Sequence, residues 1–222
     1  MNNSTSARKK ILANLRESPV AAKKYPRNDA VMERKSWTEA EKILQLKSMM
    51  EAVHTEVIIC TENDWENTLR AVVKEKEIGQ LLYGSKTALA EKLRNMRQQT
   101  PDTMPELVDY KQPIEESKDL LFGIDAAITT TRGGIAETGS LILWTTPDEP
   151  RLMSLIPPIH LAVLHADTIY NTFWEAVNKE QWNSDMPTNA LLISGPSKTA
   201  DIEQTLVYGV HGCKELVVIL IQ

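Results

Sequence analysis

The chain has 222 residues, of which 42% are hydrophobic and 25% are charged. A chain of that size and composition can bury one sizeable core in a single globular domain. No apolar stretch approaches the roughly 20 residues that a membrane-spanning helix needs. The formal net charge of −5 and the lack of any recognised binding motif argue against a nucleic-acid partner. The N-terminal segment is too polar for a secretory signal, so we expect a cytoplasmic protein.

The few cysteines and histidines limit the metal chemistry of the chain. Its two cysteines, Cys60 and Cys213, lie far apart and have no C-x-x-C spacing. They therefore predict neither a disulfide framework nor a cysteine-ligated zinc or iron–sulfur site. The four histidines show no metal-binding spacing either. We expect no metal and no cofactor bound by this chain.

The charge is distributed unevenly. Residues 1–35 contain nine Lys or Arg against three Asp or Glu, a net charge of +6, which leaves 16 against 27 and a net charge of −11 for residues 36–222. This asymmetry predicts two parts. Residues 1–35 form a basic N-terminal helix, over 6–17, and a linker, and residues 36–222 form one α/β domain.

Short apolar strands alternate with amphipathic helices in the first half of that domain. Such alternation is typical of βαβ units with a largely parallel sheet. Ser36 and Glu39 have the spacing of a capping box at the start of the first helix. The expected elements are a helix over 36–52, a strand over 56–60, a helix over 61–76, a strand over 80–83, a helix over 85–99, a strand over 106–110 and a helix over 114–121.

The second half is denser in strands. A short connection between the expected strands 126–130 and 140–144 favours at least one antiparallel pairing. The fold class is therefore α/β: a three-layer, Rossmann-like open sheet, mostly parallel with at least one antiparallel pairing, plus an N-terminal helical segment. The expected elements are strands over 126–130, 140–144, 159–165, 190–194 and 215–221, with helices over 167–179 and 199–208.

The first segment that can carry chemistry runs from Arg132 to Ser140. Its glycines permit close approach of a ligand to the backbone, and its hydroxyls, amides and guanidinium can hold a carboxylate or phosphate. Glu137 is the candidate catalytic residue, as nucleophile or general base. The alternative is a tight hairpin in which the glycines serve geometry and Glu137 caps a neighbouring backbone. The candidate ligand-binding residues here are Arg132, Gly133, Gly134, Thr138 and Gly139.

The second segment, Ser194–Glu203, follows a strand and is expected to lead into the helix over 199–208. A helix N-terminus at the carboxyl end of a strand offers unpaired N–H groups to an anion. The P-loop spacing is absent, so ATP hydrolysis is not inferred. The alternative is that Ser197 or Thr199 merely caps the helix. The candidate ligand-binding residues are Ser194, Gly195, Ser197, Lys198 and Thr199.

Two further segments complete the candidate site. His211 and Gly212 lie in a glycine-containing turn before the last strand, where a histidine is less typical of a core than on an apolar strand. The double-proline connector between 151 and 160 is either a lid or a rigid connector, and Arg151 and Ser154 are expected to be exposed on it. Together the segments predict an anion-binding cleft.

Four motifs carry a resemblance to a known family: GIAETGS at 134–140, RLMSLIPP at 151–158, SGPSKTADIE at 194–203 and GVHG at 209–212. In this order they resemble the lactate-utilization protein C family, which consists of a LUD domain. Cys213 departs from the family, whose members usually have proline there. The resemblance implies a fold similar to the sugar-phosphate isomerase and CoA-transferase group. It also implies a role in oxidising L-lactate to pyruvate with two partner proteins, at least some of which carry iron–sulfur clusters.

Three hypotheses follow for the function. In the first, the chain is a non-redox accessory or ligand-binding subunit of the lactate-utilization system, with the iron–sulfur clusters on its partners. In the second, it is a stand-alone enzyme for an anionic small molecule such as an acyl-CoA or a sugar phosphate, with Glu137 as nucleophile or base. In the third, it senses such a molecule without turning it over. Whether the chain is an enzyme, and whether it forms a homo-oligomer, stays open.

Overall fold

The computed structural model describes residues 3–17, 30, 35–111, 117–184, 186–200, 206–208 and 212–222. The chain forms two compact units, Met1–Val31 and Met32–Gln222. The first contains helix α1 (Asn3–Glu17), which covers the helix expected over 6–17. Within the described residues, every helix is too short or too polar to cross a membrane.

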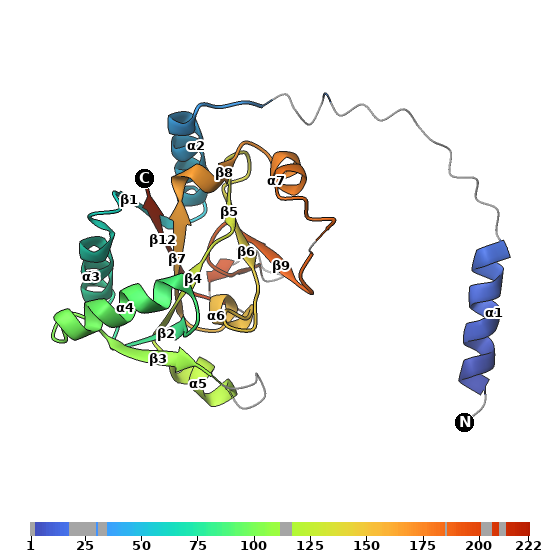
Figure 1. Cartoon of the computed structure of the whole chain (residues 1–222), viewed down its shortest axis with the longest axis horizontal. Helices are drawn as coiled ribbons and strands as arrows, with labels where there is room; N and C mark the ends of the chain where they lie inside the picture. The colour runs from blue at the N-terminus through green and yellow to red at the C-terminus, as the bar shows by residue number, and fades with distance from the viewer. Residues whose placement is uncertain are drawn as a thin grey trace. The chain divides into compact units, whose positions relative to one another are not determined.

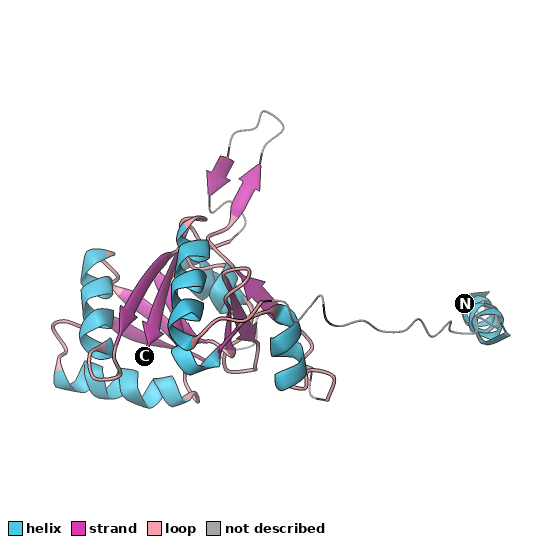
Figure 2. Cartoon of the chain, turned by 90° about the horizontal axis from the view of Figure 1, so that it is seen from above, coloured by secondary structure: helices cyan, strands magenta, loops and turns pink. Residues whose placement is uncertain are grey.

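A six-stranded parallel sheet forms the centre of the second unit (Figures 1 and 2). Every pairing in it is parallel, as expected for strands joined by helical crossovers. The strands expected over 56–60, 106–110, 126–130, 159–165 and 215–221 are confirmed with those bounds. In spatial order the strands are β1 (Glu56–Cys60), β12 (Glu215–Ile221), β7 (Ile159–His165), β4 (Ala126–Thr130), β2 (Gln80–Gly84) and β3 (Glu106–Tyr110).

Helices α3 (Trp65–Glu75) and α4 (Ala88–Gln99) cover one face of this sheet (Figure 1). Their buried side chains, among them Leu69 and Leu93, pack with Ile128 of β4 and Ile219 of β12 in the largest core cluster. The apolar stripe of each helix thus meets the continuous apolar face of parallel strands, which drives the pairing of the two layers.

The opposite face is covered by α2 (Glu39–Glu51), by the short helices α5 (Lys118–Gly123) and α6 (Leu152–Leu155), and by a second sheet. Leu46 and Met50 of α2 pack against Leu164 of β7. Helix α2 is capped by Thr38, whose side chain forms a capping box with Glu41. The expected box at Ser36 and Glu39 is therefore wrong by two positions, because Thr-x-x-Glu satisfies the same hydrogen bonds two residues later.

The second sheet contains antiparallel pairings, as expected, but the strands at 126–130 and 140–144 do not pair with each other, because they lie in different sheets. Strand β6 (Ser140–Trp144) pairs antiparallel with β5 (Gly133–Ile135) and β9 (Ala190–Ile193), and β5 pairs parallel with β8 (Ile169–Tyr170). Strand β5 was not expected, because its three residues include two glycines and give no alternating pattern. In spatial order the strands are β8 (Ile169–Tyr170), β5 (Gly133–Ile135), β6 (Ser140–Trp144) and β9 (Ala190–Ile193).

Two expected helices are corrected by the structure. The helix expected over 167–179 is confined to α7 (Phe173–Lys179), which is capped by Thr172 and preceded by a 3-10 turn and β8. The helix expected over 199–208 is wrong: β10 (Lys198–Ala200) and β11 (Leu206–Tyr208) form an antiparallel hairpin there. Both places are rich in Ile, Val, Thr and Tyr, and these residues favour strands once a partner strand is present. The helix expected from residue 114 is described from Lys118 onward.

Candidate functional site

The two glycine-containing segments meet in the structure. The Oγ atoms of Ser140 and Ser194 are 2.8 Å apart, and Thr138 Oγ1 lies 2.8 Å from Ser140 Oγ. The antiparallel pairing of β6 with β9 sets this register, since Leu141 is opposite Ile193. The carbonyl oxygen of Ser194 also accepts a hydrogen bond from the Thr55 hydroxyl at 3.0 Å. We call this series of hydrogen-bonded residues, Thr138, Ser140, Ser194 and Thr55, the hydroxyl chain. It joins the two segments to each other.

The glycines of these segments allow helix α2 and the turn after it to pack closely against the backbone of the segments. Gly139 has a φ of +58°, and a Cβ placed on it would overlap the Cβ of Met49 on α2. A Cβ on Gly195 would lie 2.9 Å from the carbonyl oxygen of Val53, in the turn just after the same helix. A Cβ on Gly134 would lie 3.1 Å from a methyl group of Leu46. Helix α2 therefore fills the space beside all three glycines.

Glu137 lies beside a cavity rather than in the hydroxyl chain. Its backbone N–H donates to the carbonyl oxygen of Asn171 at 3.0 Å, and its carboxylate pairs with Lys35 Nζ at 2.9 Å. Lys35 lines a cavity of about 460 Å³ at α7, which falls in the size range of small-molecule sites. The other residues that line it are Ser36, Asn171, Thr172, Trp174, Glu175, Asn178 and Lys179.

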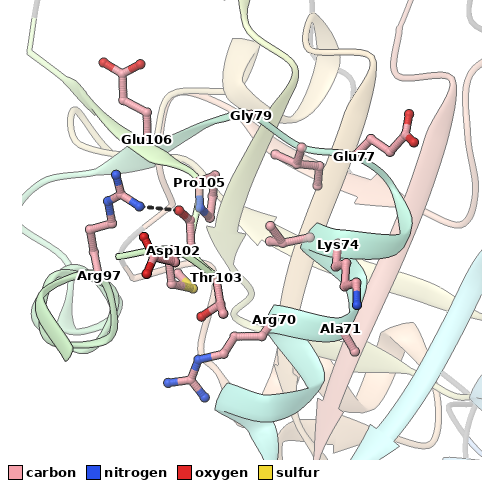
Figure 3. A pocket seen from close by; sticks show the side chains of 13 residues that line it. Arg70, Ala71, Lys74, Glu77, Gly79, Arg97, Asp102, Thr103, Pro105 and Glu106 are labelled. Atoms are coloured by element: carbon pink, nitrogen blue, oxygen red, sulfur yellow. Dashed lines mark hydrogen bonds between the residues drawn. The ribbon is translucent and has the colours of Figure 1, made fainter. Parts of the chain in front are cut away.

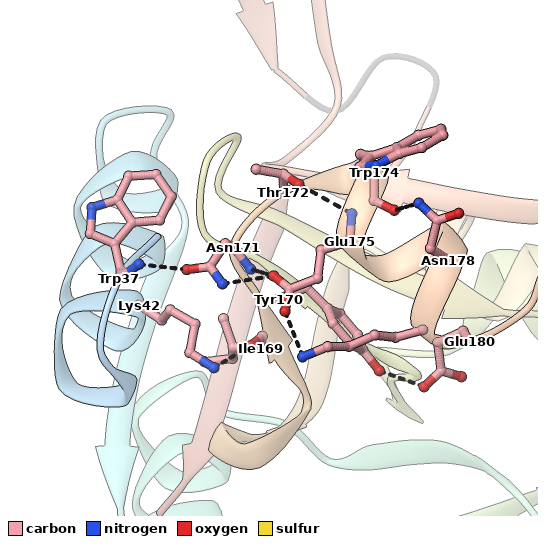
Figure 4. Close-up of polar contacts among 11 residues, drawn as sticks. Trp37, Lys42, Ile169, Tyr170, Asn171, Thr172, Trp174, Glu175, Asn178 and Glu180 are labelled. Carbon is pink, nitrogen blue, oxygen red and sulfur yellow. Dashed lines mark hydrogen bonds and ion pairs between the residues drawn. The ribbon is translucent and has the colours of Figure 1, made fainter. Parts of the chain in front are cut away.

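A hydrogen-bond network joins residues that line this cavity (Figure 4). Asn171 Oδ1 accepts from the backbone N–H of Trp37 at 2.7 Å, and Asn171 Nδ2 donates to Glu175 at 2.7 Å. Burial acts to raise the pKa of Glu175, but hydrogen bonds from Lys179 and Asn171 hold it below its usual range. The cavity therefore presents two lysines, each in an ion pair with a carboxylate group, Lys35 with Glu137 and Lys179 with Glu175.

Arg132 is placed away from Glu137, at the opposite end of β5. Its guanidinium pairs with Glu180 and lies 5.3 Å from the centre of the Trp144 ring. Glu180 also accepts from the hydroxyl of Tyr170, whose pKa is raised by burial and by that hydrogen bond. The structure thus commits Arg132 to a side-chain ion pair, and it does not bring Arg132 and Glu137 into one site.

The second segment continues into a hairpin, so no helix N-terminus faces a ligand at Lys198. The prediction that a helix N-terminus in this segment offers N–H groups to an anion is therefore wrong. Ser197 donates its backbone N–H to the carbonyl oxygen of Cys213 at 2.9 Å, and a Cβ on Gly212 would lie 2.7 Å from the Cβ of Ser197. The turn before the last strand, which contains Gly212, therefore contacts the Ser194–Glu203 segment. Thr199 lies on β10 beside Lys198, and His211 lies outside the described residues.

A buried polar cluster at the end of β4 was missed by the sequence analysis. Glu149 is 8% exposed and accepts from the backbone N–H and the hydroxyl of Thr130, at 3.0 and 2.5 Å. Burial raises its pKa. Its neighbours Pro-Asp and Pro gave it the pattern of an exposed turn, so no sequence signal marked it. Ser154, expected to be exposed, is buried because α6 packs on β4 and β7.

His160 and Thr129 also belong to this buried polar cluster. His160 is fully buried, its Nε2 lies 2.9 Å from Thr129 Oγ1, and its Nδ1 has no hydrogen-bond partner within the described chain. Burial lowers the pKa of this histidine to about 4. Cys213 is buried as well, and burial raises the pKa of its thiol, which disfavours a reactive thiolate. No three His, Cys, Asp or Glu side chains of the described residues are grouped as metal ligands.

A cavity of about 820 Å³ lies at the amino ends of β2 and β3 (Figure 3). Buried apolar side chains such as Val73, Ile78 and Met104 contribute to its wall. Arg97 donates hydrogen bonds to the carbonyl oxygens of Pro101 and Met104 and so closes one side. Three cationic and three carboxylate side chains line it, so its charge selects neither anions nor cations.

The fold and these sites define an α/β protein with a parallel sheet, a smaller mixed sheet and polar loops between the two. The family model of the LUD domain matches residues 43–221. The chain belongs to the LUD domain family and, within it, to the lactate-utilization protein C group.

Individual relatives agree with this assignment. An uncharacterized protein of Neisseria meningitidis serogroup B is 37% identical over 97% of this chain and 94% of its own length. Lactate utilization protein C 1 of Bacillus mycoides is 30% identical over 78% of this chain and 75% of its own length. A crystal structure of a DUF162 family protein from Deinococcus radiodurans superposes with a TM-score of 0.60 and 19% identity, covering 84% of this chain and 100% of that one. That likeness supports the fold.

Proposed function

We propose that this protein is a non-redox, ligand-binding subunit of a cytoplasmic L-lactate utilization system that oxidises L-lactate to pyruvate. The observation that carries the proposal is similarity over most of the chain to proteins named lactate utilization protein C, from Bacillus mycoides and, at 27% identity over 80% of this chain, from an Exiguobacterium species.

The number and position of the cysteines do not fit an iron–sulfur cluster held by this chain, and we therefore assign the clusters of the proposed system to partner proteins. Cys60 pairs in register with Ile221 at the end of β12, whereas Cys213 precedes the start of that strand. The length of β12 therefore separates the two thiols. Iron–sulfur clusters are usually held by four cysteine thiolates, and this chain has two cysteines. Electrons from lactate would pass to clusters held by the partners.

Deletion of the gene should abolish growth on L-lactate as the sole carbon source while growth on pyruvate continues. Complementation with a tagged copy should restore growth and co-purify iron–sulfur proteins. The measurement is the growth rate in a strain without any other lactate dehydrogenase. Undiminished growth of the deletion strain on L-lactate would contradict the proposal.

A second candidate function is a stand-alone enzyme for an anionic small molecule. The observation that favours it is the position of Glu137, partly exposed at the edge of a cavity of ligand size. Replacing Glu137 by Gln keeps the shape and removes the nucleophile or base. If this function is correct, E137Q should retain its melting temperature and lose turnover of the acyl-CoA or sugar phosphate by 100-fold or more, on the order seen for general acid–base groups. Equal turnover by E137Q and the wild type would rule it out.

A further inference from the structure

The buried cluster at Glu149 lies where ligands bind in open α/β sheets. Strand β4 is flanked by β7 and β2 in the interior of the parallel sheet, and Thr130 is its last residue. Crevices beyond the carboxyl ends of such strands are the usual ligand sites. Both hydrogen bonds that Thr130 donates end on Glu149, so the carboxyl group is fixed over the end of this strand.

Glu149 is buried without a positively charged partner. Its side chain forms no ion pair within the described residues, and its two donors are the amide and hydroxyl of Thr130. A carboxyl group in this situation holds its proton more strongly than an exposed one. Groups of this kind cluster at sites that bind or transfer protons. In its protonated form Glu149 can donate a hydrogen bond to an oxo oxygen of a ligand, and in its ionised form it can accept one from a hydroxyl group.

A small cavity opens beside Glu149. It has a volume of about 10 Å³ and is lined by Thr129, Thr130, Ser154 and Arg151, among others. This is about the space that a single water molecule occupies. The cavity can therefore accept one oxygen atom of a larger molecule, while the rest of that molecule stays outside.

His160 orients the hydroxyl of Thr129 toward a ligand. We assign the imidazole proton to Nε2, because the partnerless Nδ1 is then a lone pair rather than a buried N–H group. With this tautomer His160 donates to Thr129 Oγ1 over the observed 2.9 Å. The hydroxyl proton of Thr129 remains free, and Thr129 lines the cavity. The cavity thus offers a hydrogen-bond donor to an incoming oxygen.

Arg151 supplies a cation at the same cavity. Its side chain is exposed and forms no ion pair with any described residue, in contrast to Arg132, which pairs with Glu180. A guanidinium group binds a carboxylate through two parallel hydrogen bonds. A ligand that satisfies this arrangement carries an oxygen substituent next to a carboxylate.

We propose that this cavity binds a small 2-oxo or 2-hydroxy carboxylate, with the C2 oxygen between Thr129 and Glu149 and the carboxylate on Arg151. The choice of pyruvate and L-lactate as ligands rests on the proposed function, whereas the geometry specifies an oxygen next to a carboxylate. Glu149 and Thr129 act by hydrogen bonding to the oxygen, and Arg151 acts by charge. The cavity at Lys35 and Glu137 is a separate place on the molecule.

The test is calorimetric titration of the full-length protein with pyruvate, L-lactate and propionate. Propionate has the same carboxylate and carbon number but lacks the C2 oxygen. Pyruvate or L-lactate should bind about 10-fold or more tightly than propionate, because a buried donor left unpaired is costly. R151Q should weaken pyruvate and propionate alike, by about 10-fold. T129V should reduce the preference for pyruvate over propionate.

A control variant tests whether the effect of R151Q is specific to the cavity. R70Q changes an arginine on α3 that pairs with Glu66, remote from the cavity, and should leave all affinities unchanged. Melting temperatures show that each variant is folded. Equal affinity for pyruvate and propionate, unchanged binding by R151Q, or no binding at millimolar ligand would each overturn the inference.

The site and the proposed function fail separately. Binding that depends on Arg151, in a protein whose deletion leaves growth on L-lactate intact, keeps the site and contradicts the proposed function. Loss of growth on deletion, together with no preference for ligands that carry the C2 oxygen, keeps the proposed function and contradicts the site.

Discussion

Replacing Gly139 by alanine should lower the free energy of unfolding by about 2–4 kcal/mol. Two costs add. The residue has a φ of +58°, which an L-residue with a side chain adopts unfavourably, and the new Cβ would overlap Met49 and its neighbouring backbone on α2. Neither neighbour is the free end of a side chain, so relief requires movement of the helix. Urea unfolding of the purified variant measures the loss.

Gly123 provides the matched control for this substitution. It ends α5, and a Cβ placed on it meets no atom within 4 Å. G123A should therefore leave the stability within about 1 kcal/mol of the wild type, with a small gain expected from helix propensity. If G139A is as stable as G123A, the close packing of α2 on the Arg132–Ser140 segment is not the native arrangement.

The stability of the protein should fall by about 3 kcal/mol through His160 alone when the pH is lowered from 7 to 4. The unfolded chain binds the proton of this histidine near pH 6.5, whereas burial delays protonation in the folded chain to about pH 4. The unfolded state therefore binds more protons throughout that window. The contribution is complete above pH 6.5 and is lost as the pH falls toward 4.

The slope of unfolding free energy against pH isolates this histidine. H160Q should remove that part of the slope between pH 6.5 and 4, even if it lowers the stability at every pH. Glu149, whose pKa burial raises, contributes with the opposite sign but equally in both proteins. H165Q, which changes an exposed histidine at the end of the same strand, should keep the wild-type slope. An unchanged slope in H160Q would show that His160 is not buried and neutral.

The sequence predicted the large sheet well because its strands are continuous apolar runs. Leu216–Ile221 or Ile159–His165 can be accommodated only in the interior of a sheet, and turn residues bound them. The short strands β5, β8, β10 and β11 were not predicted, because two or three residues carry no period. The pairing of β8 with β5 also depends on a partner strand that is distant in sequence, whereas β10 and β11 are neighbours in a hairpin.

The candidate site was predicted in part for a similar reason. The meeting of the Arg132–Ser140 and Ser194–Glu203 segments follows from two predicted strands, which bring Ser140 and Ser194 together. The partners of Glu137 and Arg132 could not be predicted, since Lys35 and Glu180 are distant in sequence from them and charged residues give no contact signal. Glu149 was missed because burial of a carboxyl group depends on the packing of α6 and β6 around the end of β4.

The proposed function makes this chain a non-redox subunit that iron–sulfur partners require for lactate oxidation. The most direct measurement is L-lactate-dependent reduction of an electron-accepting dye by the purified partner proteins, with and without this chain. We predict that oxidation requires the chain and that all iron–sulfur absorbance belongs to the partners. An unchanged rate without the chain, or iron–sulfur absorbance in the chain purified alone, would contradict the account.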